Sequence, residues 1–269
     1  MARTTHASAC RGTSASENKT RLKARLLCST LVLIAPAIAA ADQLPTGASV
    51  AAGDVSIATP GAQSMTITQG SDRAVVNWNS FSIGAGASVD IRQPSSSSAI
   101  LNRVTGSADS RIHGRLTANG QVHLVNPNGI FIGKSGRVET GGGFVASTLD
   151  VMDGDFMQGR LRYGGNGRSA KVTNRGAITV GRGGYAALIG GRVDNAGTVV
   201  VPLGRIGLAA GEQVTLDVSG DGFLQVALPS EDDGNPDALI TNSGRVSADG
   251  GLIEMKAATA RFVGTQSER

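Results

Sequence analysis

Histidine and carboxylate side chains perform most of the acid–base and metal chemistry of proteins, and this chain arranges them sparsely. His113 and His123 lie ten residues apart with no cysteine and no carboxylate pair close by, which does not match the spacing of a metal site. The run from Glu231 to Asp237 is rich in oxygen ligands, but it lacks the EF-hand pattern and is more typical of a solvated loop than of a Ca²⁺ site. The chain also lacks a nucleophile elbow and a phosphate-binding loop. We therefore expect no catalytic residue, no bound metal and no cofactor.

A second polar cluster, Asn126-Pro127-Asn128-Gly129-Ile130, lies between two apolar stretches at residues 122–125 and 130–132. Proline fixes φ and biases the preceding residue away from the helical region, while Asn-Gly supplies the φ values of a tight turn. Both asparagine side chains can hydrogen-bond the nearby backbone. The pattern predicts a stiff corner between two strands. It leaves open whether this corner only shapes the chain or also contacts a partner.

An internal repeat predicts the elements that hold this corner. Three stretches share asparagine, glycine at +2, a β-branched residue at +4, glycine at +9 and a large apolar residue at +11. Their first two shared residues are Asn174 and Gly176, Asn195 and Gly197, and Asn242 and Gly244; the last two are Gly183 and Tyr185, Gly204 and Ile206, and Gly251 and Ile253. A fourth copy begins at Lys134, without the asparagine. We interpret each Asn-x-Gly as a corner whose residues tolerate positive φ, and whose asparagines can hydrogen-bond from coil to coil.

A repeat of about 21 residues with alternating apolar positions is typical of a β-solenoid. The copies start 40, 21 and 47 residues apart, so the longer intervals hold a diverged coil or an insertion. At this period, ~230 residues predict roughly 11 coils. Short strands at 65–68, 75–78 and 89–92 are expected to cap the first coil, with Trp78 and Phe81 as anchors. The alternative is a β-sandwich whose hairpins are alike by chance.

Composition and charge agree with a strand-rich chain and argue against binding of nucleic acid. Glycine accounts for 38 of the 269 residues, which weakens helices and favours tight turns and closely stacked strands. Residues 1–39 contain six of the 25 basic residues and one of the 21 acidic residues, which leaves 19 basic and 20 acidic residues in the remainder. Without a basic excess there, the main source of affinity for nucleic acid is missing.

The first 39 residues have the pattern of a signal peptide. A basic n-region of about 25 residues precedes an apolar run at 26–39 that is too short to span a bilayer. Ala-x-Ala sites predict cleavage after residue 39 or 41. An uncleaved anchor and a lipoprotein are the alternatives, against which Pro36 and the early position of Cys28 argue. Both cysteines precede the cleavage sites, so the mature chain is expected to contain no disulfide.

Four motifs occur in order along the chain: Ile67–Gly70 with Val76–Trp78, Leu101-Asn102-Arg103-Val104, Asn126–Ile130, and Gly142–Asp150. With these motifs, the stretch from about Leu44 to Ala260 resembles the secretion domain of two-partner-secretion exoproteins, the filamentous-haemagglutinin-like family. It is most similar to the high-molecular-weight adhesin branch, because the second asparagine-proline motif of the haemagglutinin branch is missing. The long n-region is also similar to the extended signal peptides of this family.

The resemblance implies an all-β fold, namely a right-handed parallel β-helix (β-solenoid) with an N-terminal β cap. It divides the chain into a signal peptide at 1–39, the cap with the first coils at 42–100, and further coils at 101–265 that continue the same domain. It implies export through the periplasm of a Gram-negative bacterium to the cell surface or medium. The expected partner is an outer-membrane transporter barrel with periplasmic polypeptide-transport-associated domains. Asn126–Ile130, Asn102 and Arg103 are expected to serve recognition or folding.

Exoproteins of this family usually continue into a long adhesive region, whereas this chain ends at Arg269. An adhesin role is therefore expected by analogy alone. Two other functions stay open. One is a surface module that binds glycans or a host-cell protein, and the less favoured one is a β-helix enzyme that acts on polysaccharides. We expect that the chain is not an enzyme.

Overall fold

The computed structural model describes residues 44–167, 169–218, 220, 222–229 and 239–258. The predicted signal peptide, both cysteines and the acidic run at 231–237 lie outside these ranges. Within them, no helix is long and apolar enough to cross a membrane.

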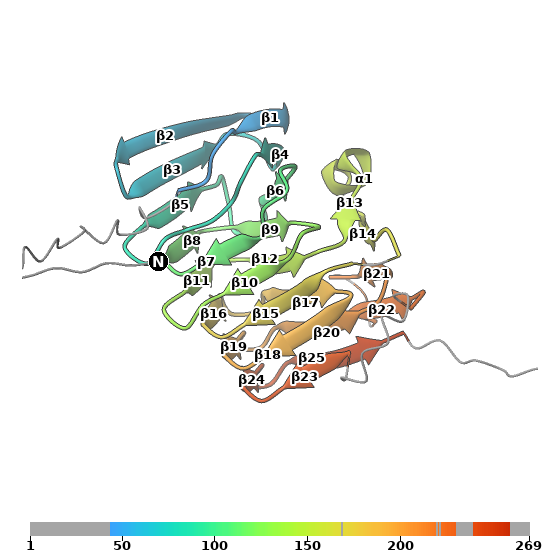
Figure 1. The fold of residues 1–269 in the computed structure, drawn as a ribbon. Helices are drawn as coiled ribbons and strands as arrows, with labels where there is room; N and C mark the ends of the chain where they lie inside the picture. The colour runs from blue at the N-terminus through green and yellow to red at the C-terminus, as the bar shows by residue number, and fades with distance from the viewer. Residues whose placement is uncertain (1–43, 168, 219, 221, 230–238, 259–269) are drawn as a thin grey trace, which may run out of the picture. The chain divides into compact units, whose positions relative to one another are not determined.

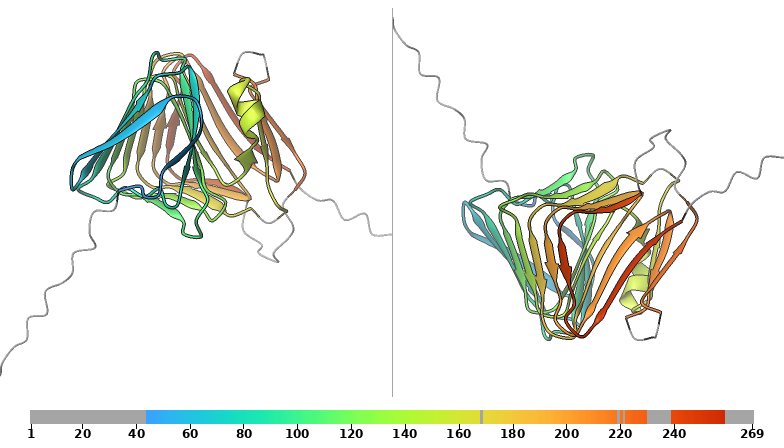
Figure 2. Two further views of the ribbon diagram at one scale, coloured as in Figure 1. Left: turned by 90° about the horizontal axis from the view of Figure 1, so that it is seen from above. Right: turned by 90° about the horizontal axis from the view of Figure 1, so that it is seen from below.

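The described chain winds through three sheets that form the sides of a coil (Figures 1 and 2). The first sheet contains β1 (Ser49–Ala52), β4 (Arg73–Trp78), β6 (Ala99–Val104), β9 (Gln121–Val125), β12 (Gly143–Ser147), β17 (Tyr185–Gly190), β20 (Arg205–Ala210) and β25 (Leu252–Ala257). The second contains β2 (Val55–Gly61), β3 (Ser64–Gln69), β5 (Ser88–Arg92), β8 (Arg115–Ala118), β11 (Arg137–Thr140), β16 (Ala177–Val180), β19 (Thr198–Val200) and β24 (Arg245–Ser247). The third contains β7 (Ser110–Ile112), β10 (Ile130–Ile132), β15 (Lys171–Asn174), β18 (Arg192–Asn195) and β23 (Ile240–Asn242).

Along the chain, successive strands lie in the third, second and first sheets in turn. Thus β10, β11 and β12 make one coil, and β18, β19 and β20 make another. Strands of neighbouring coils stack in parallel and in register, for example β16 between β11 and β19. Within the described part of these three sheets, only β1 and β2 run antiparallel to their partners. These two strands therefore form the N-terminal cap. The structure confirms the predicted parallel β-helix with a β cap.

The number of coils is smaller than the sequence predicted. Among the described residues, seven parallel strands from β3 to β24 stack in the second sheet, whereas the period alone predicted roughly 11 coils. Part of the difference arises because the described residues between β12 and β15, and those between β20 and β23, form two insertions outside the three sheets of the coil. The stretches at 65–68, 75–78 and 89–92 do form strands, but these strands, β3, β4 and β5, already belong to coils, so assigning them to the cap was wrong.

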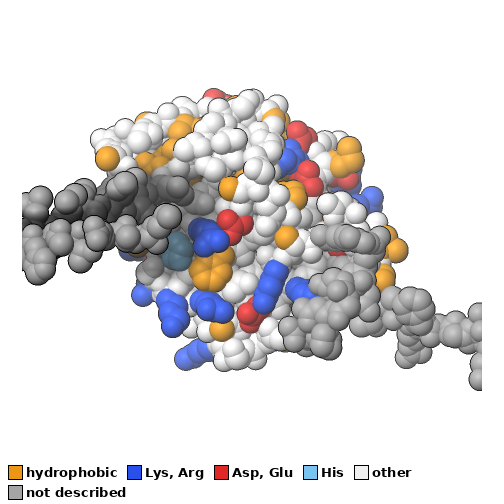
Figure 3. All heavy atoms as spheres, viewed as in Figure 1, with side chains coloured by type: hydrophobic (Ala, Val, Ile, Leu, Met, Phe, Trp, Pro, Cys, Tyr) orange, Lys and Arg blue, Asp and Glu red, His pale blue; other side chains and the backbone are white. Residues whose placement is uncertain are grey.

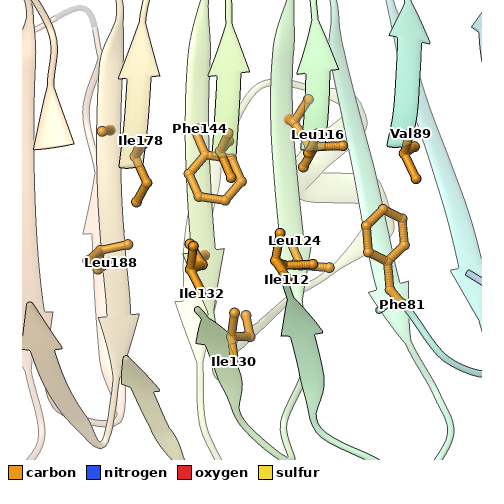
Figure 4. Packing of buried hydrophobic residues seen from close by; sticks show 14 of the residues in the cluster. Phe81, Val89, Ile112, Leu116, Leu124, Ile130, Ile132, Phe144, Ile178 and Leu188 are labelled. Atoms are coloured by element: carbon orange, nitrogen blue, oxygen red, sulfur yellow. The ribbon is translucent and has the colours of Figure 1, made fainter. Parts of the chain in front are cut away.

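The main core consists of apolar side chains that point inward from every coil. Leu116, Val138, Ile178 and Val199 occupy one register position on consecutive coils and are fully buried. In Figure 4, buried residues from the other two sheets, including Phe144, fill the space beside this row. The alternating pattern of the repeats therefore marks the inward positions correctly in the second sheet.

A fourth, antiparallel sheet covers the outside of the first sheet. It contains β13 (Asp150–Val151), β14 (Leu161–Gly164), β21 (Gln213–Leu216) and β22 (Leu224–Ala227), and α1 (Asp153–Met157) connects its first two strands. We call these elements the outer layer. Its Phe156 and Tyr163 pack with outward-pointing residues of the first sheet such as Leu101 and Val145 to form a second apolar cluster. The first sheet is thus buried on both faces, which explains continuous apolar runs such as residues 186–189.

One repeat position differs from the sequence interpretation. The register pairs Ala186 with Ile206 and places Tyr185 beside Arg205, so Tyr185 points outward rather than into the core. The chain takes eight residues from Ile178 to Ala186 but seven from Val199 to Ile206. Because side chains alternate between the two faces of a strand, one extra residue in the turn moves Tyr185 to the other face.

Candidate functional site

Asn126-Pro127-Asn128-Gly129 forms the predicted tight corner between β9 and β10. The Gly129 N–H donates to the Asn126 carbonyl oxygen at 3.1 Å, and the Asn128 N–H donates to Asn126 Oδ1 at 3.0 Å. Gly129 has φ +120°, a value that favours glycine. The corner is therefore closed by its own backbone and by the first asparagine side chain.

Asn126 also ties the corner to the coils on both sides. Its side-chain amide donates to the Ala108 carbonyl oxygen at 3.0 Å and to Ser110 Oγ at 2.9 Å on the preceding coil. Its backbone N–H donates to the Ser147 carbonyl oxygen at 2.9 Å on the following coil. The residue is fully buried. Its polar atoms are therefore occupied within the fold and face no solvent.

Pro127 and Asn128 form the outward half of the same corner, and both are exposed. The Asn128 side-chain amide donates to the Gly106 carbonyl oxygen at 2.8 Å. That bond orients the side chain while leaving it at the surface. The corner thus combines an inward residue that joins coils with two outward residues that a partner can reach.

Asn102 and Arg103 are neighbours on β6 but point to opposite sides of the first sheet. Asn102 Oδ1 accepts a hydrogen bond from Trp78 Nε1 at 3.0 Å inside the main core. Its amide nitrogen is buried and, among the described residues, has no hydrogen-bond partner. Both residues lie on the strand beside β9, with Arg103 paired to Val125, one residue before the corner.

Arg103 holds the start of the outer layer against the first sheet. Its guanidinium donates to Asp150 Oδ1 at 2.8 Å and to the Val151 carbonyl oxygen at 2.6 Å, and it forms an ion pair with Asp153 at 2.6 Å. Burial lowers the pKa of Arg103, but the hydrogen bonds and charges of Asp150 and Asp153 outweigh burial, so the pKa rises above its ordinary value. The position of this motif residue therefore indicates a role in fastening the outer layer.

The three repeat asparagines form a ladder along one corner of the coil. Asn174 Nδ2 donates to Asn195 Oδ1 at 2.8 Å, and Asn195 Nδ2 donates to Asn242 Oδ1 at 2.7 Å. Asn174 and Asn195 are fully buried, whereas Asn242 on the last described coil is exposed. Each asparagine amide thus donates a hydrogen bond to the side-chain oxygen of the next asparagine, as expected of stacked asparagines.

The repeat glycines serve close stacking rather than positive φ. Gly176, Gly197 and Gly244 do not have positive φ values, so the conformational reason inferred from the sequence is wrong. A Cβ atom on Gly197 would lie 2.3 Å from the Gly176 carbonyl oxygen, and one on Gly244 would lie 2.1 Å from the Gly197 carbonyl oxygen. Glycine is needed here because each corner rests directly on the backbone of the corner before it.

His113 and His123 do not come together. His123 lies fully buried under the outer layer, where its Nδ1 is 2.6 Å from Tyr163 Oη and its Nε2 is 3.0 Å from Tyr185 Oη. Tyr185 Oη in turn donates to Gln121 Oε1 at 2.9 Å. This chain of hydrogen bonds was not predicted from the sequence. The sequence feature that could have indicated it is a histidine inside the apolar run at 122–125, because such a run is typical of a strand buried on both faces.

Burial and, to a lesser extent, the positive charge of Arg73 together lower the pKa of His123 to about 3. The imidazole is therefore neutral at neutral pH, with one nitrogen donating and the other accepting. Burial also raises the pKa of Tyr163 and Tyr185 above the ordinary tyrosine value. All three groups are thus held in their neutral forms, which suits a structural hydrogen-bond chain in an apolar layer.

Comparison with known proteins agrees with these features. The Heme/hemopexin-binding protein of Haemophilus influenzae is 33% identical over 219 residues, which cover 78% of this chain and 23% of that protein. A second Haemophilus influenzae protein of that name is 43% identical over 99 residues, which cover 37% of this chain and 11% of that protein. The chain thus spans less than a quarter of the length of these relatives.

The crystal structure of the HMW1 secretion domain from Haemophilus influenzae matches with a TM-score of 0.72 and 34% identity, covering 79% of this chain and 56% of that chain. A family model described as TPS secretion domain matches residues 38–268. These matches confirm the resemblance that the ordered motifs indicated. The chain belongs to the TPS (two-partner-secretion) secretion-domain family.

Proposed function

We propose that the periplasmic domains of a cognate outer-membrane transporter recognise this chain through the outward half of the Asn126–Ile130 corner. As a secretion domain, the chain is part of an exported Gram-negative exoprotein, and such a domain implies a transporter in the outer membrane. In this proposal the signal peptide brings the chain to the periplasm. The transporter then binds it there and passes it to the medium or the cell surface.

The observation that supports this proposal is the division of the corner into two halves. Asn126 is fully buried and bonds to both adjacent coils, so it acts in folding. Pro127 and Asn128 are exposed on a turn that the buried half makes rigid. A rigid, exposed turn binds a partner with little loss of conformational entropy. Recognition and folding are therefore separable at this motif.

The test is an export assay in cells that produce the chain with its transporter, comparing Asn126→Ala, Asn128→Ala and Asn119→Ala. Asn119 is a matched control, because it is also exposed and hydrogen-bonds a neighbouring corner through Gln93. We expect Asn128→Ala to remain folded, since an exposed hydrogen bond contributes about 1 kcal/mol or less, and to be exported poorly. Asn126→Ala is expected to lose both stability and export, whereas Asn119→Ala is expected to keep export.

Circular dichroism and thermal unfolding of each purified variant separate the two effects. If folded Asn128→Ala reaches the medium as fast as the wild type, the exposed half does not take part in recognition. If the wild type reaches the medium without any transporter, the proposed partner is wrong.

A further inference from the structure

The outer face of the third sheet carries one aromatic side chain surrounded by basic side chains. Phe131 on β10 is half-buried and lies beside Arg111 of β7 in the strand register. The Arg175 guanidinium carbon lies 5.9 Å from the centre of the Phe131 ring, and the His113 ring lies 5.7 Å from it. Lys171 begins the next strand, β15, and is exposed. We call Arg111, His113, Phe131, Lys171 and Arg175 the Phe131 face.

Basic residues are gathered here although the chain outside residues 1–39 has no basic excess. Figure 3, in the view of Figure 1, shows Lys and Arg side chains clustered over β10, β15 and β18. Arg111 pairs with Asp109 at 3.0 Å and Lys171 with Asp194 at 3.3 Å, and the two basic side chains remain 63% and 50% exposed. Exposed pairs of this kind contribute about 1 kcal/mol or less. A ligand with a denser negative charge can therefore compete with these two carboxylates.

The strand of Phe131 places no side chain of its own beside the Phe131 ring. Both outward neighbours of Phe131 on this stretch are glycines, Gly129 and Gly133. A Cβ atom on Gly133 would lie 2.3 Å from His113 Nδ1, so glycine at this position allows His113 to lie beside the ring. Because neighbouring strands are about 4.8 Å apart, the Phe131 ring on β10 and the basic groups of β7 and β15 lie within roughly 10 Å.

We infer that the Phe131 face binds a sulfated oligosaccharide. An aromatic ring offers a flat apolar surface for the C–H face of a sugar, and guanidinium groups bind sulfate through paired N–H donors. Highly sulfated sugars carry several anionic groups per repeating unit, which matches basic groups on adjacent strands. An extended acidic peptide fits less well, because β10 and β15 are paired on both sides and offer no free strand edge.

This site is independent of export, so its test needs only the purified protein. Binding of a heparin-derived oligosaccharide is measured by calorimetry at two salt concentrations for the wild type, Phe131→Ala, Phe131→Tyr, Arg111→Gln and Arg92→Gln. Arg92 is the matched control, since its side chain is 69% exposed and it also pairs with an aspartate two residues earlier, Asp90, at 2.9 Å. Thermal unfolding verifies that each variant is folded.

We expect Phe131→Ala and Arg111→Gln each to raise the Kd about five- to tenfold. Phe131→Tyr and Arg92→Gln are expected to stay within about twofold of the wild type, and added salt to weaken binding. The inference is overturned if the wild type does not bind at physiological salt, or if Arg92→Gln loses as much affinity as Arg111→Gln. It is also overturned if polyglutamate competes as well as the oligosaccharide, because the occupant would then be an acidic peptide.

Discussion

Acidification is expected to destabilise this domain through one buried histidine. His123 has a pKa of about 3 in the folded chain and about 6.5 when unfolded. Between these values the unfolded state binds a proton that the folded state does not bind. The stability associated with neutral His123 is therefore complete above pH 6.5 and is lost as the pH falls toward 3. The slope is about 1.4 kcal/mol per pH unit, so lowering the pH from 7 to 5 costs about 2 kcal/mol.

Urea unfolding at pH 7 and pH 5 measures this loss in the wild type and in His123→Gln. Other groups also titrate in this range, so the informative quantity is the difference between the two proteins. In His123→Gln the loss between pH 7 and pH 5 should be smaller than in the wild type by about 2 kcal/mol.

A second measurement covers the case in which His123→Gln does not fold. In the wild type, an NMR titration should show that the His123 imidazole stays neutral down to about pH 4, since its pKa is about 3. The reasoning is refuted if this imidazole titrates near pH 6.5 while the domain is folded. It is also refuted if a folded His123→Gln variant keeps the full pH dependence of the wild type.

Three further substitutions test other parts of the structure. Asn195→Ala removes both ladder hydrogen bonds, whereas Asn242→Ala removes only one, so urea unfolding should show a loss of about 2 kcal/mol for Asn195→Ala against about 1 kcal/mol for Asn242→Ala; equal losses would contradict the ladder. Gly197→Ala places a methyl group 2.3 Å from the Gly176 carbonyl oxygen, whereas Gly164→Ala meets nothing within 4 Å, so only the former should lower the Tm. Arg103→Ala removes the bonds to Asp150 and Val151, so amide exchange at residues 150–164 should accelerate while the coil strands stay protected; unchanged exchange there would show that Arg103 does not fasten the outer layer.

The coil itself could be predicted because its signals are local. Alternating apolar residues and a spacing of 21 residues identified Ile178 and Val199 as equivalent inward positions, and the register confirms this. The same method failed at Tyr185, where one additional turn residue reversed the direction of the side chain. Offsets counted along the chain cannot detect such a change, because the face of a strand depends on turn length.

The outer layer could not be predicted, because its pairing is not local. Leu161 pairs with Leu216, 55 residues further along the chain, and no short-range pattern links the two insertions. The buried environment of His123 could not be predicted for the same reason, since its hydrogen-bond partners Tyr163 and Tyr185 come from two later elements. At the corner, the turn at Asn126–Ile130 followed from residue types alone. The division between buried Asn126 and exposed Asn128 required the neighbouring coils.

The pairing of β14 with β21 changes how the domain unfolds. In a simple solenoid each coil contacts only its neighbours, so coils fray one by one from an open end. Here β14 follows the coil that contains β12, and β21 follows the coil that contains β20, with the β17 coil between them. The β20 coil cannot detach from the coils before it without separating β14 from β21 and exposing the second apolar cluster. The coils from β12 to β20 are therefore expected to unfold together rather than one by one.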